Sequence, residues 1–171
     1  GKAIPDTVYG VSKQSAENLI RNSGIPFVIL RMSNVYGPGC SPNYNSVVAT
    51  LCHRAIKGLP LVINGDGQQC RDFVYIEDVV RAFMFAGFES LAGWAKIFNV
   101  SSGQMVSLKK IVKQISRFHK NTKVEFLMDK KNSEISYSCD PSKFSKKYGW
   151  RPRVSLAKGI EQNLSYFGGR K

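Results

Sequence analysis

A short apolar segment that follows a predicted helix is the feature that most constrains the fold of this chain. Residues 26–32 read Pro-Phe-Val-Ile-Leu-Arg-Met, and a continuous apolar run of this length predicts a strand buried on both faces of a parallel sheet. Residues 7–23 are predicted to form the helix before it, which stops at Gly24. Because a helix leads directly into a buried strand, the sequence indicates an α/β fold.

Helices and strands continue to alternate along the rest of the chain. Ser107 is a predicted helix N-cap, and Asp140 is predicted to cap a short helix that has Pro141 at its first position. Residues 33–44 are rich in glycine, proline, serine and asparagine and are predicted to form a loop. The other helices are predicted over 46–57, 77–88 and 155–167, and the other strands over 61–63, 70–75, 96–100 and 124–127.

Charge is the unusual part of the composition. The 171 residues include 25 basic and 12 acidic side chains, which gives a net charge of +13, and residues 105–171 hold most of the surplus. Such a field concentrates anions, either nucleotide diphosphates or nucleic acid, although a solvated basic helix face would give the same composition. The charge by itself therefore identifies no partner.

Two further patterns exclude classes of protein. No apolar run approaches the ~20 residues that cross a bilayer, so we expect no membrane partner. The four cysteines are widely spaced, without a C-x-x-C pair or matching histidines. We therefore expect free thiols in a reducing compartment, the cytoplasm, and no metal site.

A tyrosine and a lysine lie four residues apart in the first predicted helix. Tyr9 and Lys13 would share one face of this helix, about a turn apart. An ammonium group near a phenol stabilises the phenolate, which is the form that acts as a base. An ordinary amphipathic helix with a surface lysine has the same spacing, so this pair alone does not establish a catalytic site.

Five segments of the chain match one family in the same order. They are Tyr-Gly-Val-Ser-Lys at 9–13, Leu-Arg-Met-Ser-Asn-Val-Tyr-Gly-Pro-Gly at 30–39, the segment 64–80 with its Gly-Asp-Gly and Arg-Asp-Phe-Val, Phe-Asn-Val-Ser-Ser-Gly at 98–103, and Asp-Pro-Ser-Lys at 140–143 with Tyr-Gly-Trp-Arg-Pro at 148–152. Together they resemble the carboxy-terminal half of the extended short-chain dehydrogenases, the NAD-dependent nucleotide-sugar epimerase/dehydratase family that includes UDP-glucose 4-epimerase.

This resemblance implies the late part of a Rossmann-like parallel sheet together with a small substrate-binding α/β domain. Residues 1–35 and 65–104 would belong to the Rossmann-type part, and residues 36–64 and 105–171 to the nucleotide-sugar-binding part. The strand, glycine-rich turn and helix that receive the NAD pyrophosphate in this family have no counterpart here. We therefore expect the chain to be part of a longer enzyme that forms a homodimer when intact. We expect the chain alone to be inactive, because the main NAD site lies in the N-terminal half that it lacks.

The resemblance also implies catalytic and cofactor-binding residues. Tyr9 would be the acid and base on a sugar hydroxyl, and Lys13 would hold the nicotinamide ribose of NAD and favour the phenolate. Met32 and Ser33 would line the nicotinamide pocket.

Further residues would hold the diphosphate of a nucleotide-sugar. Asn34 and Arg71 match the family's positions for this role, and a guanidinium offers a fixed fork of donors to phosphate oxygens. An ion pair with Asp72 or Asp78 is the alternative role for Arg71.

The remaining matches concern the nucleoside and a loop near the C-terminal part. Val47 and Asn64 align with uridine-contacting positions, although Val47 could equally be a core residue. Lys131 and Glu134 stand where many members carry Arg-x-Gly-(Asp/Glu), and a lysine keeps the charge of the arginine but loses its bidentate geometry.

The resemblance favours an NAD-dependent enzyme that acts at C4 of a UDP-hexose. Hydride removal would give a 4-keto intermediate, and hydride return to the opposite face would make the enzyme a UDP-sugar 4-epimerase. The alternatives are a nucleotide-sugar 4,6-dehydratase, a non-catalytic relict that binds anions or RNA, and a non-catalytic subunit that completes another subunit's sheet. We do not expect a nucleic-acid partner, because no clear aromatic-basic RNA motif occurs.

Overall fold

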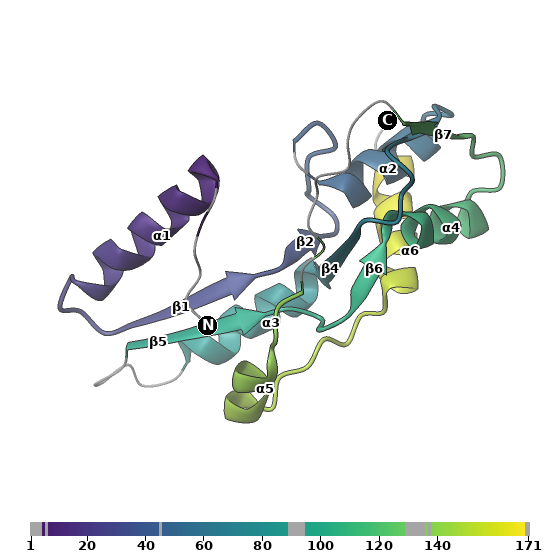
Figure 1. The fold of residues 1–171 in the computed structure, drawn as a ribbon. Coiled ribbons are helices and arrows are strands. Elements are labelled where there is room, and N and C mark those ends of the chain that lie inside the picture. Colours follow the sequence, from purple (N-terminus) through teal and green to yellow (C-terminus); the bar gives the residue numbers. More distant parts are fainter. Residues whose placement is uncertain are drawn as a thin grey trace.

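Six helices and seven strands make up the part of the chain that the structure describes (Figure 1). The structure is a computed structural model and describes residue 5 and residues 7–44, 46–88, 95–128, 136 and 138–169. The helices are α1 (Val8–Arg21), α2 (Val47–Ile56), α3 (Ile76–Gly87), α4 (Leu108–Phe118), α5 (Ser142–Tyr148) and α6 (Leu156–Gly168). The strands are β1 (Phe27–Met32), β2 (Asn34–Tyr36), β3 (Leu61–Asn64), β4 (Cys70–Tyr75), β5 (Ala95–Val100), β6 (Met105–Ser107) and β7 (Val124–Leu127).

The strands form three small sheets in which parallel pairing predominates. β1 pairs in parallel with β5, from Phe27 opposite Ala95 to Met32 opposite Val100. β2 pairs in parallel with β4, and β6 joins β4 in the antiparallel direction to give the order β2-β4-β6. β3 pairs in parallel with β7. Parallel strands connected through helices confirm the predicted α/β fold.

Strand β1, the apolar run at 26–32, is less buried than predicted. Residues 27–31 are half-buried and Met32 is 43% exposed, so the prediction that both faces are covered was wrong for this structure. Among the described residues β1 has β5 along one edge, and no second strand lies along the other. The continuous apolar run therefore correctly indicated a parallel strand. The described elements that pack on β1, however, leave its side chains partly exposed.

Two strands and one helix start differ from the sequence prediction. Residues 34–36 were predicted as loop but form β2, because β4 provides a parallel partner for them. Residues 105–107, for which no strand was predicted, form β6 on the opposite edge of β4. Asp140 was predicted as the N-cap of α5, but Pro141 occupies that position. The Asp140 carboxylate instead accepts hydrogen bonds from the backbone nitrogen and the hydroxyl of Ser142, both at 2.8 Å.

Helix α1 stands apart from the other elements (Figure 1) and contains no buried residue. Thr7 caps it, because its Oγ1 accepts a hydrogen bond from the backbone nitrogen of Gly10 at 3.0 Å. A bidentate ion pair connects α1 to β1, since the Nε and Nη2 atoms of Arg31 each lie 2.7 Å from a carboxylate oxygen of Glu17. Polar pairing, and not burial, therefore orients α1 in this structure.

Two hydrophobic clusters hold the rest of the structure together. The larger cluster lies where α2, α4 and α6 contact one another and the β2-β4-β6 sheet, with Leu51, Ile111 and Ile160 fully buried. The smaller cluster joins α3, β5 and α5 around Phe98 and Trp150. Ser107 caps α4 as predicted, accepting from the backbone nitrogen of Lys110 at 3.3 Å, and thereby helps to fix the start of this amphipathic helix.

Candidate functional site

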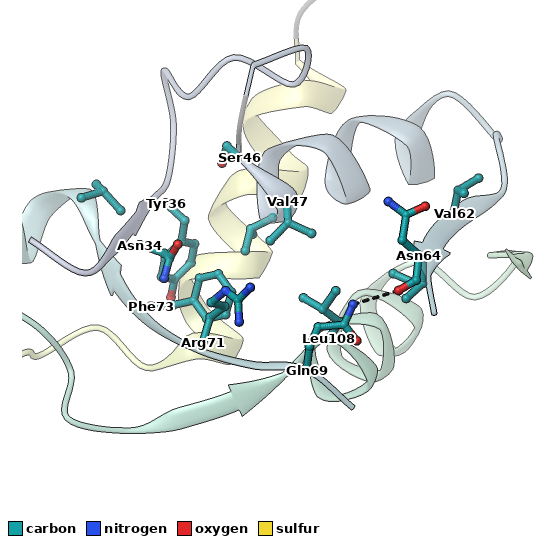
Figure 2. A pocket seen from close by; sticks show the side chains of 13 residues that line it. Asn34, Tyr36, Ser46, Val47, Val62, Asn64, Gln69, Arg71, Phe73 and Leu108 are labelled. Atoms are coloured by element: carbon teal, nitrogen blue, oxygen red, sulfur yellow. Dashed lines mark hydrogen bonds between the residues drawn. The ribbon is translucent and has the colours of Figure 1, made fainter. Parts of the chain in front are cut away.

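A cavity of about 330 Å³ opens between β2, β3, β4 and the first turns of α2 and α4. Figure 2 shows that Asn34 lies on one side of Arg71, and that Gln69, Asn64 and Val62 lie on the other side. Four residues that the family resemblance assigns to a nucleotide-sugar therefore line one cavity. The complete lining is Asn34, Val35, Tyr36, Ser46, Val47, Val48, Val62, Ile63, Asn64, Gln69, Arg71, Phe73 and Leu108.

Arg71 supplies the cation of the cavity. It lies on β4, and its Nη1 donates a hydrogen bond to the carbonyl oxygen of Cys70 at 3.0 Å. A guanidinium presents five N–H donors in a fixed planar fork, a geometry that matches the oxygens of a phosphate. In Figure 2 the guanidinium lies between Asn34 and Gln69, below Val47. This position suits contact with an anion inside the cavity.

The two carboxylates proposed as alternative partners of Arg71 are engaged by other donors. Asp72 is fully buried, and its Oδ1 accepts hydrogen bonds from the Ser33 hydroxyl at 3.2 Å and from the backbone nitrogen and hydroxyl of Ser102 at 2.9 and 2.7 Å. Its Oδ2 accepts from the backbone nitrogen of Gly103 at 2.9 Å. Asp72 thus ties the junction after β1 to the turn after β5.

Asp78 is also fully buried and organises a different region. Its carboxylate pairs with the guanidinium of Arg81. It also accepts hydrogen bonds from the backbone nitrogens of Arg153 at 3.0 Å and Val154 at 3.1 Å. Its backbone carbonyl accepts from the indole nitrogen of Trp150 at 3.1 Å. These contacts dock the segment before α6 onto α3.

The amides of the cavity are positioned by backbone contacts. The Nδ2 of Asn34 donates to the carbonyl oxygen of Asp72 at 2.9 Å, which holds this side chain across the β2–β4 pair. The Nε2 of Gln69 donates to the carbonyl oxygen of Asn64 at 2.9 Å (Figure 2). Gln69 therefore connects the end of β3 to the start of β4 at the edge of the cavity.

The wall of the cavity is built by tight packing around Tyr36. This phenol is almost fully buried, and burial raises its pKa above the ordinary value, so it remains neutral at physiological pH. Its ring makes edge-to-face contacts with Phe73 and Tyr75. A Cβ added to Gly159 of α6 would lie only 2.4 Å from the Tyr36 hydroxyl oxygen, so only a glycine fits there without movement.

Tyr9 and Lys13 lie outside the lining of this cavity. They adjoin each other on α1, with the Nζ of Lys13 5.2 Å from the centroid of the Tyr9 ring, and Tyr9 is 72% exposed. Met32 is exposed at the carboxyl end of β1, one residue before the buried Ser33 and two before Asn34. The structure thus brings four predicted site residues together in the cavity and leaves Tyr9 and Lys13 on helix α1, outside it.

Two other predicted site residues, Lys131 and Glu134, lie outside the described residues. Sequence reasoning missed Gln69, Ser46, Val62 and Leu108 as lining residues. Gln69 falls within the Gly-Asp-Gly to Arg-Asp-Phe segment that matched the family, two residues before Arg71. This spacing along a strand could have indicated that Gln69 lies near the site.

The cavity combines one guanidinium with amide and hydroxyl groups and with apolar walls. Arg71 provides the charge, while Val47, Val62 and Leu108 provide apolar surface. A site with few polar groups and aliphatic walls suits a ligand that joins an anion to a flat or apolar body. Among the described residues no group of three or more His, Cys, Asp or Glu side chains could hold a metal ion. No helix in the described part of the chain is long and apolar enough to cross a membrane.

Solved structures similar to this chain include two epimerases. UDP-glucose 4-epimerase from Thermotoga maritima, solved with UDP-glucose, has a TM-score of 0.83 and 31% sequence identity, over 96% of this chain and 54% of that chain. UDP-glucuronic acid 4-epimerase from Bacillus cereus, solved with UDP-glucuronic acid and NAD, has a TM-score of 0.86 and 31% identity, over 97% of this chain and 54% of that chain.

Sequence comparison extends the relationship to dehydratases and identifies the family. dTDP-glucose 4,6-dehydratase from Haemophilus influenzae is 26% identical over 180 residues, covering 95% of this chain and 52% of the relative. The chain thus spans about half the length of the curated relatives that it matches. A sequence model of the NAD dependent epimerase/dehydratase family matches residues 2–101. The chain belongs to the NAD-dependent epimerase/dehydratase family, with a Rossmann-like α/β fold.

Proposed function

We propose that the protein to which this chain belongs is a UDP-sugar 4-epimerase that works through a 4-keto intermediate. The observation that carries this proposal is the cavity that gathers Asn34, Val47, Asn64 and Arg71. The two similar epimerase structures, both solved with a UDP-sugar, support the choice of substrate class.

The order of groups along the cavity suggests how a nucleotide-sugar lies in it. Arg71 binds the diphosphate, because its guanidinium lies near the middle of the lining (Figure 2). Val62 and Asn64, beyond Gln69, contact the nucleoside, and Val47 covers it. Asn34 lies on the opposite side and receives the diphosphate at the end that carries the sugar. Lys131 and Glu134 are proposed to bind the substrate as well.

The sugar then extends from Asn34 toward Met32 and the N-terminal end of α1. Tyr9 removes the proton from the C4 hydroxyl and later returns it, and Lys13 beside the ring stabilises the phenolate. In this structure the Tyr9 phenol is exposed and lies outside the lining of the cavity.

The family cofactor NAD fits part of the residue set assigned to it. The accessible side chains of Tyr9, Lys13 and Met32 could contact the nicotinamide riboside. The Ser33 hydroxyl is buried and donates to Asp72, so it would hold the end of β1 in place and would not contact the cofactor. When bound, the nicotinamide supplies the hydride acceptor and donor. The residues of this chain hold it and move the proton.

A nucleotide-sugar 4,6-dehydratase is the second candidate. The Haemophilus influenzae relative carries that name and covers 95% of this chain. Both activities share the 4-keto intermediate, so they differ only in the steps after hydride removal. The reaction product therefore distinguishes them.

We also propose an organisation for the whole protein. Residues 1–35 and 65–104 form the Rossmann-type part, and residues 36–64 and 105–171 form the substrate part. Helix α1 contains no buried residue and exposes Val8, Val11 and Leu19, so we propose that it is covered in an intact cytoplasmic homodimer. The 171-residue chain alone is proposed to have no turnover, because Tyr9 and Lys13 are not enclosed.

The test is turnover of UDP-glucose by the polypeptide that contains this chain, with NAD present and products identified by NMR. A 4-epimer supports the epimerase, and a 4-keto-6-deoxy sugar supports the dehydratase. Tyr9→Phe is expected to abolish turnover while the circular dichroism spectrum is retained, and Tyr44→Phe, a change at another exposed tyrosine, is the matched control. Near-normal turnover of Tyr9→Phe would refute the assigned role.

A further inference from the structure

The outer face of α4 carries a continuous cationic stripe. Lys109, Lys113 and Arg117 follow one another at intervals of four residues, and Lys110 lies beside them. All four side chains are exposed. With 1.5 Å of rise per residue, the stripe extends over about 12 Å of helix surface.

The stripe is fixed in orientation because the opposite face of α4 is part of the core. Leu108, Ile111, Val112 and Ile115 are buried in the larger hydrophobic cluster. α4 therefore cannot turn its apolar face toward another molecule without unfolding the domain. Any contact made by this helix must use the cationic face.

The charge of this region is not balanced by acidic residues nearby in the sequence. Residues 105–124 contain no aspartate or glutamate, and exposed Lys120 and Lys123 in the turn after α4 add to the stripe. Glu125 on β7 is the next acidic residue along the chain. Such a surface attracts polyanions and anionic interfaces.

Exposed apolar side chains flank both ends of the stripe. Phe118 is exposed at the C-terminal end of α4. Near the N-terminal end, the Nζ of Lys109 lies 6.0 Å from the centroid of the exposed Phe126 ring on β7. Aliphatic and aromatic side chains beside lysines are the combination that enters the boundary between lipid headgroups and acyl chains.

We propose that the face formed by α4 and the end of β7 binds the surface of an anionic lipid membrane. The stripe lies on a convex helix, whereas single-stranded nucleic acid is usually held in a groove with aromatic stacking platforms. A cluster of basic residues on an amphipathic helix is typical of a surface that binds anionic lipid headgroups, and the Phe118 and Phe126 rings can insert among acyl chains. This face lies at the opposite end of the molecule from α1 (Figure 1), so a partner that covers α1 leaves it accessible. No segment needs to cross the bilayer.

The test is co-sedimentation of the 171-residue chain with vesicles. We expect binding to vesicles of phosphatidylcholine mixed with phosphatidylglycerol, weaker binding at raised ionic strength, and no binding to pure phosphatidylcholine. The variant Lys109→Gln/Lys113→Gln/Arg117→Gln is expected to bind about a hundredfold more weakly. Loss of one basic residue near an anionic surface weakens binding about fivefold, and this variant loses three.

Matched controls separate this surface from net charge. Lys146→Gln/Lys147→Gln/Arg151→Gln removes the same charge from α5 and the segment after it, and is expected to retain most of the binding. Phe118→Ser changes no charge and is expected to weaken binding at raised ionic strength; unchanged binding would contradict the apolar part of the contact.

Several results would overturn the proposal. These are absence of binding to anionic vesicles, equal binding to neutral vesicles, or equal losses in the two charge variants. Binding of single-stranded RNA that depends on the α4 lysines, without vesicle binding, would also overturn it and assign the face to nucleic acid.

Discussion

The buried carboxylate of Asp72 offers the sharpest test of how the candidate site is held in place. It accepts four hydrogen bonds, three at Oδ1 and one at Oδ2, from Ser33, Ser102 and Gly103. Asp72→Asn keeps the size of the side chain but replaces one acceptor oxygen by a donor. The new NH₂ group would then face a group that is itself a donor, either a backbone N–H or a serine hydroxyl, and the original hydrogen bond would be lost.

The expected loss of unfolding free energy can be worked out from these contacts. A hydrogen bond to a charged group contributes about 1.5–3 kcal/mol, and a buried donor left without an acceptor costs about 1–3 kcal/mol. Losing one such bond and weakening the other three gives an expected destabilisation of about 3 kcal/mol. This is a large part of the 5–15 kcal/mol that is typical of a domain. Because Asn34 donates to the carbonyl of Asp72, ligand affinity should fall as well.

The assay is urea unfolding of the chain followed by circular dichroism, with the midpoint and slope fitted for each variant. Glu125→Gln, the same carboxylate-to-amide change at an exposed position of β7, is the control and is expected to change stability by less than about 0.5 kcal/mol. A midpoint for Asp72→Asn equal to that of Glu125→Gln would refute the role assigned to Asp72.

Two other predictions concern packing and pH. Gly159→Ala should destabilise the chain by about 1–3 kcal/mol, because the new methyl group collides with Tyr36. Gly168→Ala is the control and should be nearly neutral, because its Cβ would meet its nearest atom at 3.7 Å. Equal urea midpoints for the two variants would contradict this prediction. The hydrogen bonds from Arg31 lower the pKa of Glu17 below its ordinary 4.5, so the stabilisation by this pair is present above that value and is lost as pH falls through the lowered pKa. The midpoint difference between the wild type and Glu17→Gln should therefore shrink on acidification, and a difference that stays constant down to pH values well below 4.5 would contradict the assignment.

The elements with strong local patterns could be predicted from the sequence. The apolar run of β1 and the amphipathic pattern of α4 each specify their element within a few residues. The Ser107 cap formed as predicted because its hydroxyl bonds a backbone nitrogen only three residues away. Such features depend on neighbours along the chain, which a sequence displays directly.

The features that were missed depend on contacts between distant segments. Residues 34–36 look like a loop, and they become β2 only because residues 73–75 pair with them. The half-burial of β1 likewise depends on which layers cover it, and its own apolar run carries no information on that point. The predicted N-cap of α5 was wrong by one residue, since Pro141 and not Asp140 takes that position. This error concerns the boundary of the helix and not a distant contact.

The cavity was only partly predictable for the same reason. Asn34, Val47, Asn64 and Arg71 were selected one by one from family motifs, and their common cavity depends on the packing of β2, β3 and β4 against α2 and α4. The Gln69 amide was overlooked because its value lies in a contact with the Asn64 backbone. The binding roles of these residues stay predictions until a ligand is measured.

The proposed function depends above all on Arg71 binding the diphosphate of a nucleotide inside this cavity. The most direct measurement is isothermal titration calorimetry of UDP into the 171-residue chain, with Arg71→Gln and the matched surface change Arg151→Gln. We predict saturable binding by the wild type and by Arg151→Gln, and at least a tenfold weaker affinity for Arg71→Gln, since a hydrogen-bonded charge contributes about 1.5–3 kcal/mol. Equal affinities of the two variants, or no saturable heat with the wild type, would contradict it.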